Sequence, residues 1–143
     1  MSVFVVDASV VIKWFVPEIE SDAARRLLEL DHDYFAPDLL FAETANVVWK
    51  KIRRGELSSG QGQRLVRDLG TIAVETIACR ALANDACILA TATRRSVYDA
   101  MYLALAVRLD TRMITADQRL ASTLATIPLV ASHIQTIQDF DGH

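Results

Sequence analysis

Cysteine is scarce in this 143-residue chain, which contains only Cys79 and Cys87. The two residues lie eight positions apart in a segment with a helical pattern, which is too far for a disulfide bond between them. We therefore expect two unpaired thiols and interpret both as small buried side chains. Unpaired cysteines fit a reducing compartment, and we expect a cytoplasmic protein.

An excess of positive charge is also missing. The chain has 15 Lys and Arg residues against 18 Asp and Glu residues, a net charge of -3. We expect no global attraction to nucleic acid or to acidic membranes, so a polyanionic partner needs local basic patches or bound cations. The candidate patches are at helix ends, at Lys50, Lys51, Arg53, Arg54, Arg94 and Arg95. We interpret most of these as solvated helix ends, with a few available to contact phosphates.

The sequence has no long uninterrupted apolar run. Its apolar start lacks a basic lead and is interrupted by Asp7 and Lys13, so we expect neither a signal peptide nor a membrane span. With 52% hydrophobic and 23% charged residues, the composition is typical of a globular chain of one domain.

Strand-like and helical segments alternate along the chain. Short apolar runs predict strands over residues 3–6, 34–36, 71–77, 112–115 and 129–131. Apolar periodicity and capping residues predict helices over residues 9–16, 21–30, 38–54, 58–69, 78–93, 97–109 and 118–124. This alternation predicts an α/β fold around a parallel sheet, with ligands bound at the carboxyl ends of the strands.

Four carboxylates stand near helix starts in apolar surroundings: Asp7, Glu43, Asp99 and Asp117. Singly, each has a structural explanation. Asp7 can be a turn or capping residue, Glu43 a first-turn acid, and Asp99 the partner of Ser96 in a capping box. For Asp99 the structural and functional explanations both stay open. Thr115 and Gln118 also match a capping box, which leaves Asp117 unexplained.

Together, the four carboxylates favour a metal site. Clustered like charges repel and raise each other's pKa, and a hard divalent cation removes that cost. Oxygen-only ligands suit Mg²⁺ or Mn²⁺. No His or Cys is placed for a zinc site, and we interpret His32, His133 and His143 as surface residues in loops or near the tail.

Four segments carry a family resemblance: FVVDASVVIKWF, PDLLFAETANVVW, SVYDAMYLALAVRL and MITADQRL. In this order and spacing they resemble the PIN domain, and within it the VapC-type toxin of toxin–antitoxin pairs. The resemblance implies one PIN domain over residues 1–143 with a three-layer α/β/α fold, and a Mg²⁺- or Mn²⁺-dependent endoribonuclease. Its catalytic, metal-binding quartet falls on Asp7, Glu43, Asp99 and Asp117, with Glu43 the candidate for a second ion or for activating water.

The resemblance also assigns supporting roles and partners. Ser9, Asn46 and Thr115 would orient the metal ligands or the phosphate, and Asn46 lies three residues after Glu43, on the same helix face. The implied partners are RNA, a cognate antitoxin and a second copy of the chain. The residues Trp14, Phe15, Leu27 and Leu28 either bind a partner helix or fill the core.

Two alternatives stay open from sequence. A degenerate PIN module would bind without cleaving, although the complete quartet argues against it. A phosphatase of the haloacid dehalogenase type would need a second Asp where this chain has Ser9, and a later lysine, which is missing after Lys51. The stretch from Glu56 to Arg95 is the least diagnostic, so the RNA that is cleaved stays open.

Overall fold

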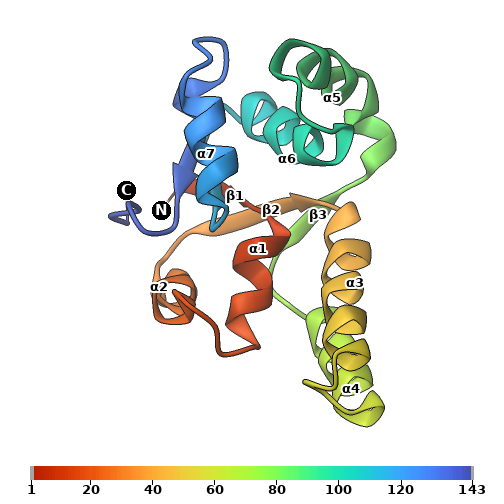
Figure 1. The fold of residues 1–143 in the computed structure, drawn as a ribbon. Coiled ribbons are helices and arrows are strands. Elements are labelled where there is room, and N and C mark those ends of the chain that lie inside the picture. Colours follow the sequence, from red (N-terminus) through yellow and green to blue (C-terminus); the bar gives the residue numbers. More distant parts are fainter. Residues whose placement is uncertain (1, 143) are drawn as a thin grey trace.

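A five-stranded parallel sheet forms the centre of the computed structural model, which describes residues 2–142 (Figure 1). The strands are β1 (Val3–Val6), β2 (Asp33–Pro37), β3 (Glu75–Ile77), β4 (Met113–Thr115) and β5 (Ile134–Thr136), in the spatial order β3-β2-β1-β4-β5. β1 is central: Val5 is in register with Phe35 of β2 and with Met113 of β4. The strand order reverses at β1, so the crevice beyond its carboxyl end is the expected ligand site.

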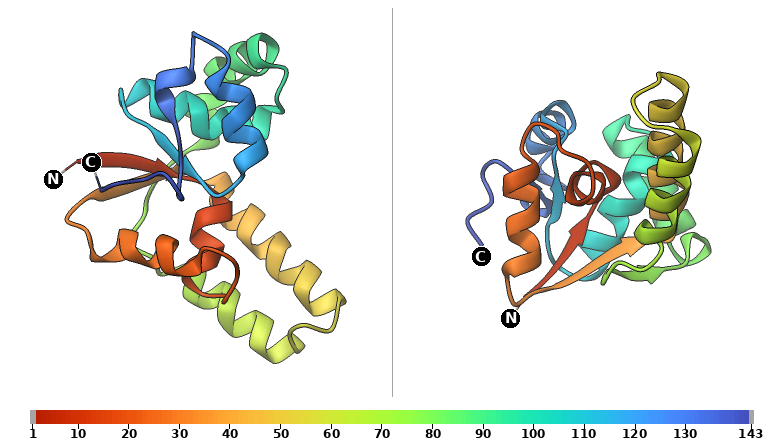
Figure 2. Two further views of the ribbon diagram at one scale, coloured as in Figure 1. Left: turned by 60° about the vertical axis from the view of Figure 1, so that its left-hand side comes forward. Right: turned by 90° about the horizontal axis from the view of Figure 1, so that it is seen from below.

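Helices cover both faces of this sheet. They are α1 (Ala8–Val11), α2 (Ser21–Arg26), α3 (Leu39–Arg53), α4 (Ser59–Leu69), α5 (Cys79–Thr93), α6 (Val97–Arg108) and α7 (Gln118–Ala125), with 3₁₀ turns at Ile12–Trp14, Leu27–Glu29 and Ala131–His133. One layer consists of α5, α6 and α7, and the other contains α1, α2 and α3 (Figures 1 and 2). The predicted three-layer α/β/α arrangement is therefore confirmed.

The core forms where the apolar patterns are densest. Every residue of α6 from Ala100 to Ala106 is buried, as expected for a helix that is apolar nearly all round. Leu103 and Leu105 pack in one contiguous cluster with Val5 and Ile114 of the central strands. In the described part of the chain no helix is both long and apolar enough to cross a membrane.

The predicted strand at 129–131 is wrong. The backbone amides of Val130 and Ala131 donate to the carbonyl of Ile127, at 3.0 and 2.9 Å, so this segment closes a turn after Pro128. Amides used within a turn are not available to a sheet. The last strand forms instead at β5, where Ile134 is in register with Met113.

The buried face of α3 includes a polar residue and leaves out an aromatic one. Leu40, Thr44 and Val48 are buried, whereas Phe41 is exposed. A threonine can occupy this face because its hydroxyl donates to the Leu40 carbonyl at 2.8 Å.

Half of the predicted partner surface belongs to the core. Trp14 and Leu27 are buried, and the Trp14 Nε1–H donates to the Ala24 carbonyl at 2.8 Å. Phe15 is partly buried, and Leu28 is 55% exposed. Trp14 and Leu27 are buried because α2 packs directly against the Ile12–Trp14 turn.

The cysteines are unpaired, as predicted, and both belong to α5. Cys79 is partly buried, but Cys87 is exposed, so its interpretation as a buried side chain is wrong. Within α5 the buried positions are Leu82, Ala86, Leu89 and Thr93, which share one face of the helix. Cys87 follows Ala86 and therefore lies off that face.

Candidate active site

Asp7 is the buried centre of the site. It directly follows β1 and is the N-cap of α1, where its Oδ1 accepts from the Val10 amide at 3.3 Å. Its exposed fraction is only 6%. Burial raises the pKa of Asp7 to about 6, because the charged form loses hydration, although hydrogen bonds from Ser9 and Thr115 oppose the shift. Within residues 2–142, no Lys, Arg or His side chain forms an ion pair with this carboxylate.

Two hydroxyls hold both oxygens of this carboxylate. The Ser9 hydroxyl donates to Oδ1 and the Thr115 hydroxyl to Oδ2, each at 2.5 Å. Thr115 reaches Asp7 from β4, the neighbour of β1 in the sheet. The prediction that Thr115 forms a capping box with Gln118 is wrong, because Asp117 caps α7 instead.

Asp117 begins α7 beside this network. Its Oδ1 accepts from the Leu120 amide at 3.0 Å, and its own amide donates to the Thr115 hydroxyl at 3.1 Å. The Ala116 amide likewise donates to the Ser9 hydroxyl at 3.0 Å. The turn between β4 and α7 is thus tied to Asp7, although the Asp117 carboxylate itself is exposed and serves as a cap.

Glu43 is held by a residue that the sequence analysis did not single out. The buried Tyr102 of α6 donates its hydroxyl to Oε1 of Glu43 at 2.5 Å. Burial raises the pKa of the Tyr102 hydroxyl and so keeps it a donor. Asn46, which we expected to orient Glu43, is exposed and makes no such bond within residues 2–142. The all-round apolar pattern of α6 predicts that Tyr102 is buried. A buried tyrosine hydroxyl needs a hydrogen-bond partner, and this need is the signal in the sequence for a contact with a polar residue.

Asp99 faces the same region from the first turn of α6. The Ser96 hydroxyl caps the helix by accepting from the Asp99 amide at 3.1 Å, so half of the predicted capping box is present. The Asp99 carboxylate instead forms an ion pair with Arg95, with 3.1 Å between Oδ2 and Nη2. Capping therefore explains Ser96, whereas the Asp99 carboxylate takes no part in the cap and is paired with Arg95.

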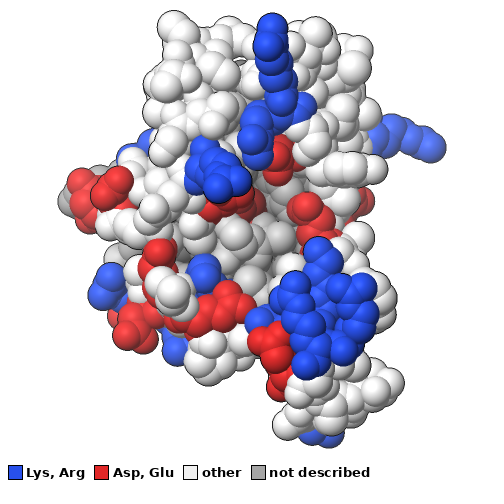
Figure 3. Space-filling view, viewed as in Figure 1, with Lys and Arg blue, Asp and Glu red and all other residues white. Residues whose placement is uncertain are grey.

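Three of the four carboxylates influence each other electrostatically. Burial is the main cause of the raised pKa of Glu43, and the negative charge of Asp99 raises it further. Glu43 in turn contributes to the raised pKa of Asp7. Like charges in a partly dry site favour either a proton or a bound cation. Figure 3 shows acidic side chains around a hollow on this face, bordered by Lys and Arg side chains.

The donor set fits a hard divalent cation, because all of its ligands would be carboxylate oxygens. Still, within residues 2–142 no three His, Cys, Asp or Glu side chains lie close enough to hold one ion. The carboxylates of Asp99 and Asp117 have other partners here, Arg95 and the start of α7. The fold brings the four predicted carboxylates to one end of the sheet, but within residues 2–142 they are not close enough together to surround one ion.

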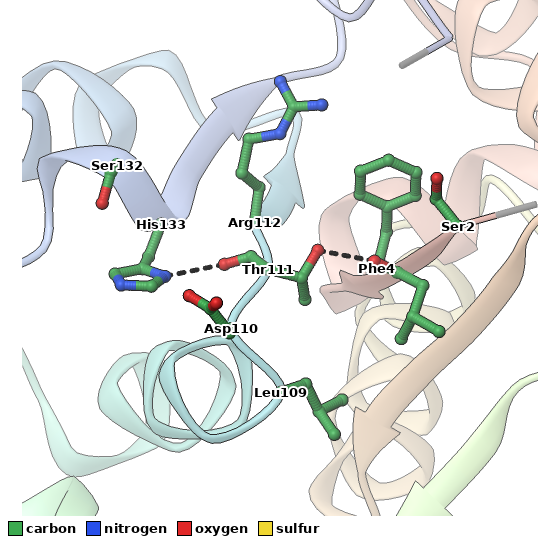
Figure 4. A pocket seen from close by; sticks show the side chains of 9 residues that line it. Ser2, Phe4, Leu109, Asp110, Thr111, Arg112, Ser132 and His133 are labelled. Atoms are coloured by element: carbon green, nitrogen blue, oxygen red, sulfur yellow. Dashed lines mark hydrogen bonds between the residues drawn. The ribbon is translucent and has the colours of Figure 1, made fainter.

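The opposite end of the sheet carries a separate hollow of about 540 Å³ (Figure 4). Its polar groups bond to each other: His133 Nδ1 lies 2.8 Å from the Thr111 carbonyl oxygen, and the Thr111 hydroxyl donates to the Val3 carbonyl at 2.5 Å. His32 is also partly buried, with the Ser2 amide donating to its Nδ1 at 3.0 Å. His32 and His133 are thus partly buried surface residues, and His143 lies outside the described residues.

Comparisons with known proteins agree with this geometry. The PIN domain family model matches residues 4–124. The chain belongs to the PIN domain family. It is 34% identical over 119 residues to ribonuclease VapC3 of Pyrobaculum aerophilum, a match that covers 82% of this chain and 91% of the relative. The predicted resemblance to VapC is confirmed, and the chain is a homologue of a VapC ribonuclease. Membership in the PIN family favours a nuclease over the phosphatase alternative.

Two solved structures share the PIN fold. PAE2754 from P. aerophilum aligns with a TM-score of 0.67 and 18% identity, covering 94% of this chain and 83% of that one. VapBC2 from Rickettsia felis, bound to a DNA fragment from its promoter, aligns with a TM-score of 0.64 and 13% identity, covering 94% and 98% of the two chains. At these identities the likeness concerns the fold alone.

Proposed function

We propose that this PIN domain is a Mg²⁺- or Mn²⁺-dependent endoribonuclease that acts as the toxin of a toxin–antitoxin pair. The observation that carries the proposal is the buried Asp7 carboxylate, held by Ser9 and Thr115 beyond the central strand. Nothing in the packing of the core requires a charge there, and burying one is costly. Homology to a VapC ribonuclease supports the same activity.

Asp7, Asp99 and Asp117 are the residues that would hold the cation, and Glu43 would hold a second ion where one binds. A bound divalent cation supplies Lewis-acid activation of the phosphodiester and of water. Ser9 and Thr115 each donate to one Asp7 oxygen and so keep the carboxylate in one orientation. Tyr102 fixes Glu43, whose raised pKa suits a carboxylate that accepts a proton from the attacking water at Oε2.

Cleavage of RNA by the purified chain tests this function. We expect endonucleolytic products with Mg²⁺ or Mn²⁺, none with EDTA, and at least a hundredfold loss in Asp7→Asn. The exposed Asp31→Asn is the matched control and should cleave like the wild type. Cleavage that persists in EDTA would reject the metal mechanism. Metal-dependent binding of RNA without any cleavage would favour the alternative of a degenerate binding module.

The proposal includes an antitoxin, a homodimer and a cytoplasmic location. The matched R. felis structure is a VapBC pair, which supports the antitoxin. Leu28 is the exposed member of the predicted partner surface, and the partly buried Phe15 lines a groove of about 330 Å³ with Leu57 and Leu65 of the α4 region. An apolar groove of this kind suits one face of a partner helix. Sedimentation of the purified chain, alone and with its antitoxin, measures both assembly states.

A further inference from the structure

The outer half of α3 carries an exposed group of residues that the proposed chemistry does not use. We define the α3 track as Trp49, Lys50, Arg53 and Arg54. All four are exposed, and Trp49 is 51% exposed. Figure 3 shows Lys and Arg side chains gathered over this half of α3, next to the acidic hollow. The net charge of -3 makes a local concentration of cations informative.

Helix geometry places two residues of the track, Lys50 and Arg54, in line with Glu43. Seven residues fall ~20° short of two helical turns, and eleven residues exceed three turns by ~20°. Lys50 and Arg54 therefore lie on the same side of α3 as Glu43, about 10 and 16 Å further along its axis. An RNA strand that leaves the crevice at Glu43 and follows α3 would meet Lys50 first and Arg54 second.

The cations of the track have no acidic partner. Lys51, on the same helix end, forms ion pairs with Glu18 at 2.9 Å and with Glu56 at 3.9 Å. Within residues 2–142, no ion pair involves Lys50, Arg53 or Arg54. Lys51 is thus a structural residue, and the other three cations are available to an anionic ligand.

Trp49 and Arg53 add a feature that a plain charge patch lacks. The Arg53 guanidinium lies 4.7 Å from the centroid of the Trp49 ring. Exposed aromatic rings and guanidinium planes are the groups on which unstacked bases pack, whereas bases within a duplex are not accessible to them. Neighbouring cations then neutralise the backbone phosphates.

We propose that the α3 track binds the single-stranded part of the RNA substrate beyond the cleavage site. Lys50 and Arg54 contact successive phosphates, and Trp49 with Arg53 stacks an unpaired base. The inference rests on the proposed nuclease function for the identity of the ligand. It assigns affinity for the substrate to residues outside the acidic quartet.

Binding in EDTA tests the track without any cleavage. The probe is a fluorescein-labelled, mixed-sequence single-stranded oligoribonucleotide, and anisotropy is measured over a salt series. Trp49→Ala should weaken binding about five- to a hundredfold with an unchanged salt dependence, and Trp49→Phe should restore most of it. Lys50→Gln with Arg54→Gln should lower the slope of log K against log salt concentration by about 1.4. Arg26→Gln, an exposed cation in the last turn of α2, should change neither quantity.

A duplex probe and the oligomeric state complete the test. Binding of blunt duplex RNA should not depend on Trp49. Three results would each overturn the proposed role of the track. They are an equal loss of affinity for duplex and single-stranded RNA, an unchanged affinity in all variants, and a loss of binding that accompanies a change in sedimenting mass. The last result would make Trp49 a contact between copies of the chain.

Failure of the track is distinguishable from failure of the nuclease. If the wild type cleaves RNA with Mg²⁺ while the track variants bind normally, the track is wrong and the function stands. If the variants lose binding but the wild type never cleaves, the track stands and the nuclease proposal falls. Cleavage of a small aryl phosphodiester, too short to reach the track, should be the same in the wild type and in Trp49→Ala.

Discussion

At the residue scale, the two more buried carboxylates of the site, Asp7 and Glu43, are held by neutral hydrogen-bond donors rather than by cations. Asp7 receives two hydroxyls and an amide, and Glu43 receives a phenol. Neutral donors stabilise a carboxylate less than a cation does, so the pKa of each group stays raised. The outcome is a site that costs stability without a bound cation.

This cost predicts a pH dependence for Asp7. Its pKa is about 6 in the folded chain against 3.8 in the reference state, so the folded state binds the proton more tightly. Asp7 therefore adds to the free energy of unfolding below about pH 4, and this contribution is lost as the pH rises through about 6. In EDTA, Asp7→Asn should be more stable than the wild type at pH 7, by on the order of 3 kcal/mol at most, and similar to it at pH 4.

Urea denaturation at the two pH values measures this difference, and Asp31→Asn is the control for removing an exposed carboxylate. A variant that is less stable than the wild type at both pH values would mean that the hydroxyl contacts outweigh the burial of charge.

Tyr102 is expected to act through Glu43. Tyr102→Phe removes one hydroxyl and keeps the ring, so the fold should persist, while Glu43 loses its donor. Since a hydrogen bond to a charged group contributes about 1.5–3 kcal/mol, we expect a ten- to hundredfold slower single-turnover cleavage. Combined with Glu43→Gln, the effect should be far from additive. Two fully additive losses would show that Tyr102 affects cleavage by a route other than Glu43.

At the element scale, strand-to-helix turns and one helical hairpin define the molecule. β1 and β4 are each followed by an Asp that caps the next helix, so one local motif delivers Asp7 and Asp117 to the same sheet edge. The hairpin of α3 and α4 extends away from the sheet (Figure 2) and carries the α3 track. Its two helices approach closely at Gly62, which is buried against Ile52 and Val48.

This close approach predicts opposite effects at two glycines of α4. A Cβ on Gly62 would lie 2.8 Å from Ile52 Cγ1, so Gly62→Ala should destabilise the chain by about 1–3 kcal/mol despite its better helix propensity. A Cβ on Gly60 would meet only Arg64 Nη1, at an ordinary contact distance of 3.8 Å, so Gly60→Ala should stabilise the chain by up to about 1 kcal/mol. Denaturation midpoints measure both changes. Adding Ile52→Val to Gly62→Ala should recover part of the loss, and a stabilising Gly62→Ala would refute the packing argument.

At the scale of the whole molecule, cation binding should stabilise the fold. A cation present at 100 times its dissociation constant contributes about 2.7 kcal/mol, so Mg²⁺ should raise the melting temperature of the wild type by several degrees. Asp99→Asn loses a partly buried ion pair with Arg95 but also loses repulsion towards Glu43, so its melting temperature without metal should stay close to that of the wild type. With Mg²⁺ it should gain less, and cleavage should fall sharply.

The measurement is the melting temperature of both proteins with EDTA and with Mg²⁺, together with their cleavage rates. Equal gains and equal rates would remove Asp99 from the proposed quartet and leave it as the ion-pair partner of Arg95.

Local chemistry made much of this protein predictable from its sequence. The alternation of elements led to the parallel sheet, and the all-round apolar pattern of α6 led to its burial. The types and chain positions of the four carboxylates led to the hypothesis of an oxygen-only site. These features depend on residue type and on spacing within one element, which a single sequence contains in full.

The tertiary structure alone decided which side chains meet. Thr115 reaches Asp7 because β4 lies beside β1, and Tyr102 reaches Glu43 because α6 and α3 meet at that edge of the sheet. Their separations of 108 and 59 residues follow from strand order and layer packing, which no periodicity encodes. The last strand begins at Ile134 rather than at residue 129 for a related reason. The amides of Val130 and Ala131 are used in the turn after Pro128, so the segment that follows pairs with β4 instead.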